Sequence, residues 1–209
     1  MTSDSWPPGP RGLRIATATA ADREEIYRIR HDVYATELRQ HPENAERRLS
    51  DALDDINEYI CASLPGEIAG FVSVTPPDHG RYSIDKYLER TELPFAVDRG
   101  LFEIRILTVK KPYRGTPIAG ILMYAALRWV EARGGTRIVL IGRGELVDVY
   151  RRAGMESLGR RFKSGAVTFE LMSATVAAAR ERADHYLPAL QRLEPLIDWQ
   201  LPMPLFPRT

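Results

Sequence analysis

Residues 106–130, "ILTVKKPYRGTPIAGILMYAALRWV", contain the pattern that decides the fold. An apolar run ends, a Tyr-Arg-Gly turn follows, and an apolar segment with helical spacing begins. This order predicts a strand at 101–109, a turn, and a helix at about 116–133 that a Gly-Gly pair ends. A turn that opens a helix presents free backbone N–H groups at the positive end of the helix dipole, where a phosphate group binds well. Because Pro117 has no N–H, this turn has lost one phosphate donor.

The bulk composition describes a single globular domain. The chain has 209 residues, 44% of them hydrophobic and 27% charged, which is enough for a full core. A net charge of +1 argues against nucleic-acid binding, which usually shows as a strong basic excess. The single cysteine, Cys61, lies in an apolar run, which favours a buried thiol over a nucleophile and fits a reducing, cytoplasmic setting. We expect no membrane span, and residues 1–11 lack a signal-peptide pattern and read as a disordered lead-in.

Hydrophobic periodicity predicts the other elements. They are a strand at 12–18, a helix at 19–40 capped by Thr19, a polar loop at 41–56, a hairpin of 57–64 and 67–75, an irregular insertion at 76–100, a strand at 136–142, a short helix at 145–154, a hairpin of 155–160 and 166–172, and a helix starting at 173. This alternation predicts an α/β (α+β) domain over residues 12–187, with a mixed sheet and helices on both faces. The proline-rich tail, 188–209, carries large apolar side chains and is expected to pack on the domain or a partner subunit.

The central segment resembles the GNAT superfamily (GCN5-related N-acetyltransferases), and the likeness covers roughly residues 12–172. The superfamily's donor motif is Arg/Gln-x-x-Gly-x-Gly/Ala, and Arg114 and Ala119 match its ends while Pro117 replaces its middle glycine. The segment "VYRRAGM", which begins at Val149, resembles the family's Tyr-x-x-x-Gly-Phe. The resemblance implies a mostly antiparallel sheet with splayed central strands, which binds a pantetheine thioester.

A second resemblance involves the N-terminal third. The stretch "RHDVYATEL" and the later "DALDDINEYICA" look like the opening of acyl-homoserine lactone synthases and N-acyl amino acid synthases, a branch that takes acyl groups from carrier proteins. The matching residues are Arg30, Tyr34, Asp51 and either Asp54 or Asp55, and the branch's usual tryptophan is absent. By this resemblance Arg30 and Tyr34 belong to the acceptor site. Asp54 and Asp55 either hold an ammonium group or form a solvated acidic turn.

Two residues are candidates for catalysis. Acyl transfer to an amine requires removal of a proton from the amine and stabilisation of the departing thiolate. Glu103, between Phe102 and Ile104 on the central strand, occupies the place of the family's carboxylate base, and partial desolvation would raise its pKa. The open alternative is a structural ion pair with an arginine, such as Arg105. Tyr150 matches the family tyrosine that hydrogen-bonds the departing sulfur, and its alternative is a core tyrosine.

The donor is expected to bind largely to backbone groups. The resemblance places the pantetheine arm along the backbone of Leu107 and Val109, and the phosphate at the turn and helix start. The predicted phosphate-binding residues are Lys111, Arg114, Gly115, Thr116, Ile118 and Ala119. A basic cluster would face either an acidic acyl carrier protein or the 3′-phosphate of coenzyme A; it comprises Lys110, Lys111, Arg114, Arg151, Arg152, Arg160, Arg161 and Lys163.

These observations predict an N-acyltransferase that moves an acyl group from a carrier-bound or coenzyme A thioester directly to a small-molecule amine, in the biosynthesis of a specialised metabolite. The alternatives are a coenzyme-A-dependent acetyltransferase of a protein amine and a non-catalytic domain that binds acyl-pantetheine. The four histidines lack metal-ligand spacing, so no metal is expected. The acyl chain, the acceptor and a homodimeric state stay open.

Overall fold

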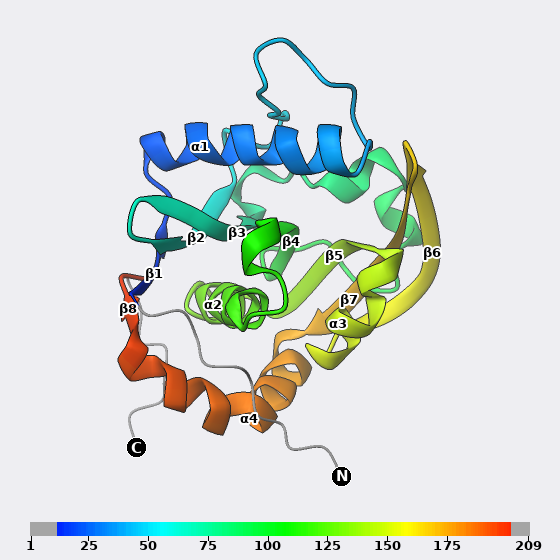
Figure 1. Ribbon diagram of the computed structural model, residues 1–209. Coiled ribbons are helices and arrows are strands. Elements are labelled where there is room, and N and C mark those ends of the chain that lie inside the picture. The colour runs from blue at the N-terminus through cyan, green and yellow to red at the C-terminus, as the bar shows by residue number, and fades with distance from the viewer. Residues whose placement is uncertain (1–11, 202–209) are drawn as a thin grey trace.

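The computed structural model describes residues 12–201 of the chain. One sheet of eight strands, in the order β6-β7-β5-β4-β3-β2-β1-β8, forms its centre (Figure 1). The strands are β1 (Leu13–Thr17), β2 (Glu58–Leu64), β3 (Glu67–Thr75), β4 (Leu101–Val109), β5 (Arg137–Arg143), β6 (Glu156–Ser164), β7 (Val167–Thr175) and β8 (Ile197–Trp199). Only the β4–β5 and β1–β8 pairs are parallel among these strands. The mixed, mostly antiparallel sheet of the prediction is confirmed.

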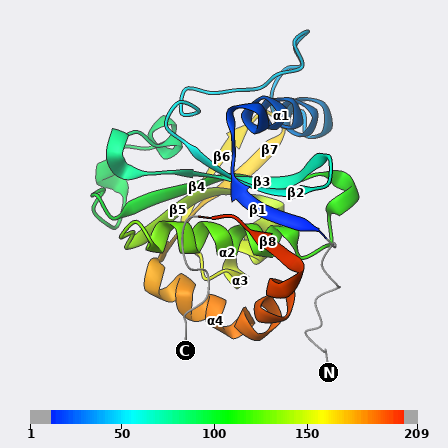
Figure 2. The same ribbon diagram turned by 90° about the vertical axis from the view of Figure 1, so that its left-hand side faces the viewer.

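Helices cover both faces of the sheet. The helix α1 (Ala20–Arg30) lies on one face, and α2 (Ile118–Glu131), α3 (Val147–Arg152) and α4 (Val176–Leu193) lie on the other (Figure 2). The largest core cluster joins α2 and α4 to the sheet, because α2 is buried almost all round. None of the helices in the described part is long and apolar enough to cross a membrane.

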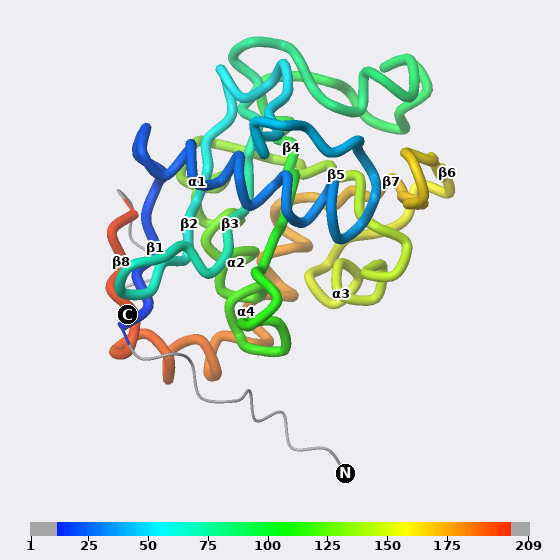
Figure 3. Tube along the Cα trace, turned by 45° about the horizontal axis from the view of Figure 1, so that its top comes forward, coloured from blue at the N-terminus to red at the C-terminus, as the bar shows by residue number. Residues whose placement is uncertain are grey.

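The first helix begins as the sequence predicts and ends differently. Thr19 forms a capping box with Asp22, in which each side chain bonds the other residue's backbone N–H. The α-helix then changes to a π-helix over His31–Glu37. Such widened turns recur at functional sites. Here the π-helix contains Tyr34, and the loop that follows passes along the same face as the 76–100 insertion (Figure 3).

The C-terminal region differs from the expected boundary at residue 187. The helix α4 continues through Pro188 to Leu193, and Leu190 and Leu193 belong to the main core. The chain then turns and adds β8 as a parallel edge strand beside β1, with Leu13 opposite Ile197. Residues 1–11 and 202–209 lie outside the described part, and so do the predicted lead-in and the end of the predicted tail.

Candidate active site

A cleft opens where the two central strands separate. β4 and β5 pair only from Leu101–Arg137 to Glu103–Val139 and then diverge. A cavity of about 230 Å³ occupies this gap, and we call it the donor cleft. Six residues predicted to bind the donor line it: Leu107, Val109, Arg114, Gly115, Thr116 and Ala119.

A β-bulge in β4 shapes the wall of this cleft. Ser73 and Phe71 of β3 pair with Arg105 and Thr108, so two residues of β4 face one of β3. Ile106, inside the bulge, has φ of 52°, a left-handed conformation that is rare for a β-branched side chain. Bulges of this kind turn side chains next to active sites. The bulge contains Leu107, the first of the two residues along which we expect the pantetheine arm.

The start of α2 supplies backbone donors at the mouth of the cleft. Pro117 is the N-cap, and the first intrahelical bond runs from the Ile121 N–H to the Pro117 carbonyl, 3.0 Å. The N–H groups of residues 118–120 therefore have no acceptor within the helix. Proline at the N-cap leaves these first-turn donors intact, so the lost N–H is confined to the turn itself.

The side chains of three residues predicted at the phosphate site are not placed to bind a phosphate in the donor cleft. The Arg114 side chain donates to the Val109 carbonyl (Nε–O, 3.0 Å) and to both carboxylate oxygens of Glu37. It thus fastens the π-helix to the turn, and its charge is already neutralised. Lys111 is exposed and does not line the donor cleft, while the Ile118 side chain is fully buried in the core. Only backbone groups of Ile118 can reach a ligand.

Tyr150 lies at the inner end of the donor cleft. Its ring packs against β5, where a Cβ built on Gly142 would lie 2.4 Å from the ring atom Cε2. Burial, together with the neighbouring Tyr34, raises the pKa of Tyr150 to about 12, although Arg143 acts to lower it. The phenol is therefore a neutral hydrogen-bond donor at any ordinary pH. Tyr34 shares a 2.8 Å hydrogen bond with Thr108 Oγ1 across the cleft.

A second, more polar pocket of about 240 Å³ adjoins the cleft, and we call it the acceptor pocket. Its polar lining includes Arg30, Tyr34, Gln40, His41, Asp51, Ser83, Lys86, Arg105 and Arg143. Three buried side-chain atoms of lining residues, Arg30 Nε, Gln40 Oε1 and Arg105 Nη1, have no hydrogen-bond partner among the described residues. One is an acceptor and the other two are charged donors, so a ligand that carries both an acceptor and a donor would match the pocket.

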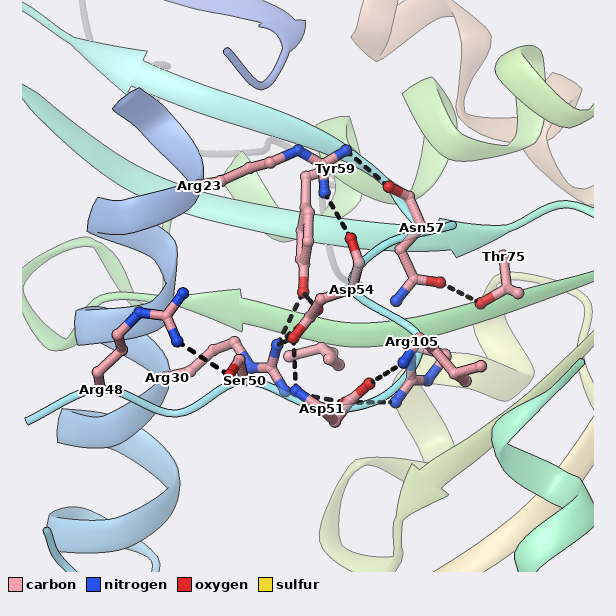
Figure 4. A network of polar contacts seen from close by, with 12 residues as sticks. Arg23, Arg30, Arg48, Ser50, Asp51, Asp54, Asn57, Tyr59, Thr75 and Arg105 are labelled. Atoms are coloured by element: carbon pink, nitrogen blue, oxygen red, sulfur yellow. Dashed lines mark hydrogen bonds and ion pairs between the residues drawn. The ribbon is translucent and has the colours of Figure 1, made fainter. Parts of the chain in front are cut away.

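A buried network of charges builds the back of the acceptor pocket (Figure 4). Arg30 donates through Nη1 to both oxygens of Asp54 at 2.8 Å, and through Nη2 to Asp51 at 2.9 Å. Arg105 donates to the same Asp51 oxygen at 2.8 Å. Burial opposes ionisation of Asp51, but the two arginines outweigh burial and hold its pKa below the ordinary value. The network is salt-bridged throughout and rigidly holds Arg105 at the pocket.

The two other predicted acceptor residues do not line this pocket. Asp54 is buried and accepts hydrogen bonds from Arg30, the Tyr59 hydroxyl and the Asp51 backbone N–H, so it has no capacity left for an ammonium group. Asp55 points to the surface and pairs with Arg81 at 3.0 Å. The aspartate at the pocket is Asp51, the first of the three in the motif.

Glu103 is fully buried behind the acceptor pocket and does not line it. Its Oε2 accepts from the Ser83 N–H at 2.7 Å, and its Oε1 accepts from the Ser83 hydroxyl and from the Ile84 N–H at 3.2 Å. Burial raises the pKa of Glu103, although Arg105 (Nε–Oε2, 4.0 Å) and these hydrogen bonds partly offset the effect. Ser83 does line the pocket. The carboxylate therefore reaches the pocket through one hydroxyl group.

A third space extends from the donor cleft on the α2 side of the sheet. It is an apolar cavity of about 470 Å³ between α2, α3, α4 and the sheet. Ile104 and Ile138 form its floor, and Met123, Ala183 and Leu190 contribute to its walls. α4 closes it, since Ala179, Ala183 and Tyr186 face it from that helix.

Sequence reasoning missed Thr108, Arg143, Ser83 and the cavity side of α4. For Arg143 a signal was available, because it directly follows the strand predicted at 136–142 and such strand ends carry ligand sites. Ser83 lies in the irregular insertion predicted at 76–100, and loops of this length are often functional. Nothing local marks Thr108 or the cavity lining of α4.

Comparison with known proteins identifies the class. The model of the family described as "Acetyltransferase (GNAT) family" matches residues 23–155, so the fold is that of an acyltransferase. The chain belongs to this family. No curated protein matches the chain in sequence.

Solved structures give the same fold. The coenzyme-A-dependent acyl-homoserine lactone synthase BjaI, bound to SAM and isopentyl-CoA, is similar with a TM-score of 0.74 and 17% identity over 92% of this chain and 96% of its own. The acyl-homoserine lactone synthase LasI has a TM-score of 0.63 and 14% identity, over 78% of this chain and 89% of its own. A putative N-acetyltransferase from Lactobacillus plantarum has a TM-score of 0.60 and 20% identity, over 79% and 99%. At these identities the likeness shows the fold alone.

Proposed function

We propose that the protein is an N-acyltransferase that moves an acyl group from a pantetheine thioester directly to a small-molecule amine. The observation that carries this proposal is the continuity of the three spaces. The donor cleft shares Tyr34, Leu107, Arg143 and Tyr150 with the acceptor pocket. It shares Gly115, Thr116, Ala119 and Val149 with the apolar cavity. The acceptor pocket thus adjoins the cleft around Tyr150, and the apolar cavity adjoins it along the start of α2 and at Val149, which leaves room for an amine on one side of the cleft and an acyl chain on the other.

The acceptor pocket favours an amine that also carries an anionic group. A buried polar atom without a partner costs about 1–3 kcal/mol, so a ligand that satisfies Arg105 Nη1 and Gln40 Oε1 recovers that free energy. A carboxylate suits the guanidinium, and an ammonium or amine N–H suits the amide oxygen. A lysine side chain of a protein substrate offers no anion to Arg105. This feature supports a small amino acid-like acceptor over a protein amine.

The residues at the junction can perform each step of acyl transfer. The acceptor ammonium gives one proton to the Ser83 hydroxyl, which passes its own proton to Glu103. The resulting amine attacks the thioester carbonyl, the C–S bond breaks with its electron pair on sulfur, and the second proton that the nitrogen must lose passes to solvent water. The Tyr150 hydroxyl donates a hydrogen bond to that sulfur. Cys61 is buried, with its pKa raised to about 12 by burial, and it lies on β2 away from the three spaces, which supports direct transfer without an acyl-enzyme.

The apolar cavity supports an acyl group longer than acetyl. We expect Ala183→Trp, which fills the cavity from α4, to reduce kcat/KM about ten- to a hundredfold for a medium-chain acyl donor and little for acetyl. The reason is that each buried CH₂ contributes ~0.8 kcal/mol, so a few excluded methylenes suffice. Ala177→Trp on the exposed side of the same helix is the matched control. Equal losses of kcat/KM for both chain lengths would mean that the cavity does not hold the acyl chain of the donor.

The pantetheine thioester can come from coenzyme A or from a carrier protein. The turn before α2 and the basic cluster distinguish these two sources. Most of the cluster is already paired with carboxylates of the chain, namely Lys110 with Glu67, Arg114 with Glu37, Arg151 with Asp148, Arg160 with Glu92 and Arg161 with Glu170. This pairing weakens the case for an acidic carrier protein. The first-turn amides of α2 that have no acceptor within the helix support the coenzyme, although that of Ile118 donates weakly to Thr116 Oγ1 at 3.5 Å.

Paired kinetics with one acyl group on both donors test the proposal. If Pro117 limits coenzyme A binding, Pro117→Gly should improve kcat/KM for acyl-coenzyme A by up to about a hundredfold, because one recovered charge-assisted hydrogen bond is worth ~1.5–3 kcal/mol. Some loss will offset this gain, since glycine loosens the helix start. If the parent enzyme has a higher kcat/KM with the carrier thioester, the carrier is the donor. Charge reversal at Arg151 and Arg152 should then weaken the reaction with the carrier in a salt-dependent way. If neither thioester transfers its acyl group to any amino acid, the alternative of a non-catalytic domain that binds acyl-pantetheine is favoured.

A further inference from the structure

Arg143, the last residue of β5, lines both the donor cleft and the acceptor pocket. Its side chain is about three-quarters buried, and the one carboxylate within 4 Å among residues 12–201 is that of Glu145, at 3.8 Å. Glu145 is itself largely exposed, at 72%. The other arginines at the pocket, Arg30 and Arg105, are both held by Asp51. Arg143 is therefore a cation at the junction of the two spaces without a firm partner in the described chain.

The surroundings of Arg143 place it beside the position where sulfur departs. The Tyr150 ring packs against Gly142, the residue just before it. Tyr34 and Tyr150 line the same two spaces as Arg143, and its charge opposes the rise in pKa that burial causes in both phenols. The Tyr34 hydroxyl is held by Thr108. One guanidinium thus faces two neutral hydroxyl groups around the end of the donor cleft.

We infer that Arg143 is the cation that stabilises the departing thiolate, with Tyr150 as a hydrogen-bond donor to the same sulfur. This inference rests on the proposed function. When the C–S bond breaks, its electron pair goes to sulfur, and the product is a thiolate beside a positive charge. Arg143 keeps its proton throughout, and no proton needs to leave Tyr150.

The relative acidities of the groups support this division of roles. An alkyl thiol such as cysteine has a pKa of about 8.5, well below that of Tyr150 in this site. Proton transfer from Tyr150 to the thiolate is therefore uphill, and the sulfur must leave as an anion. An anion in a largely buried cleft requires a fixed positive charge nearby. Among the residues shared by the cleft and the pocket, Arg143 is the one that carries such a charge.

The test is the acidity of a thiol bound in the cleft, which needs no knowledge of the acceptor. Coenzyme A is bound to the intact protein and its thiol is titrated by the ultraviolet absorbance of the thiolate. A second experiment uses 4′-phosphopantetheine, and the protein without added thiol is the blank. Cys61, the single cysteine, does not interfere because burial raises its pKa to about 12. We expect the bound thiol in the parent to titrate about one to two pH units below the free thiol, as an opposite charge nearby produces. Arg143→Gln should abolish most of this shift, and Arg143→Lys should keep part of it.

Arg14→Gln is the matched control, since it removes one positive charge from β1, four strands away from β5 in the sheet. It should leave the full shift. A parent-like shift in Arg143→Gln, or no shift in the parent, would overturn the inference. A variant Arg143→Gln that raised only the KM of the acceptor would overturn it as well. If neither thiol bound to the parent, the proposed function would fail and the inference with it. Thermal unfolding of each variant excludes misfolding as the cause.

Discussion

Replacement of Tyr150 with phenylalanine is expected to lower the turnover of acyl transfer by about ten- to a thousandfold, the range for loss of one hydrogen bond donated to developing negative charge. The ring of the variant still fills the place against Gly142, so the change removes only the hydroxyl from the inner end of the cleft. The departing sulfur then loses its neutral hydrogen-bond donor. The measurement is kcat at saturating thioester, together with the midpoint of thermal unfolding, which should change little.

Tyr27→Phe is a suitable control for this variant, because Tyr27 is as buried as Tyr150 and lines none of the three spaces. It should retain parent turnover. Parent-like turnover in Tyr150→Phe as well would assign Tyr150 to packing and leave the thiolate to Arg143 alone. A double variant with Arg143→Gln should lose less than the sum of the single losses, since both groups act on one atom.

The second large effect is expected at Ser83. Loss of its hydroxyl in Ser83→Ala cuts the path between the acceptor amine and Glu103, and general-base catalysis is worth about 10²–10⁴ in rate. Ser83→Thr keeps a hydroxyl in the same position and should retain most activity. Because the base acts only when deprotonated, turnover of the parent should rise with pH through the raised pKa of Glu103, and this limb should vanish in Ser83→Ala.

The pH profile separates this role from a structural one. The backbone N–H groups of Ser83 and Ile84 still bond Glu103 in the alanine variant, so the carboxylate should stay in place. Unchanged turnover and an unchanged acidic limb would mean that Glu103 serves only to anchor the insertion and Arg105. In that case the acceptor would have to enter as the free amine.

Much of the fold follows from short-range patterns in the sequence. The apolar run before Val109, the turn at Gly115 and the helical spacing after Pro117 specify strand, turn and helix in one stretch. Thr19 predicts the cap of the first helix, and in the structure it caps that helix through a capping box with Asp22. These signals succeed because each depends on neighbours along the chain, through period-2 or period-3.6 burial and local hydrogen bonds.

The site depends on contacts between residues far apart in the sequence, and only the tertiary structure decides them. The carboxyl group of Glu103 accepts a hydrogen bond from Ser83, twenty residues earlier. Likewise, the Asp54 carboxylate is paired with Arg30, 24 residues away. The motif "DALDD" cannot tell which aspartate will face the pocket, because that choice depends on where two arginines from other elements come to lie. Similarly, the bulge at Ile106 arises from the register with β3, and α4 closes the cavity only because β7 delivers it under α2. The sequence by itself determined most of the elements, including the order of strand, turn and helix around Gly115. Packing decided which charges are neutralised and which, like that of Arg143, stay available for chemistry, since the partner of a buried charge is set by three-dimensional proximity.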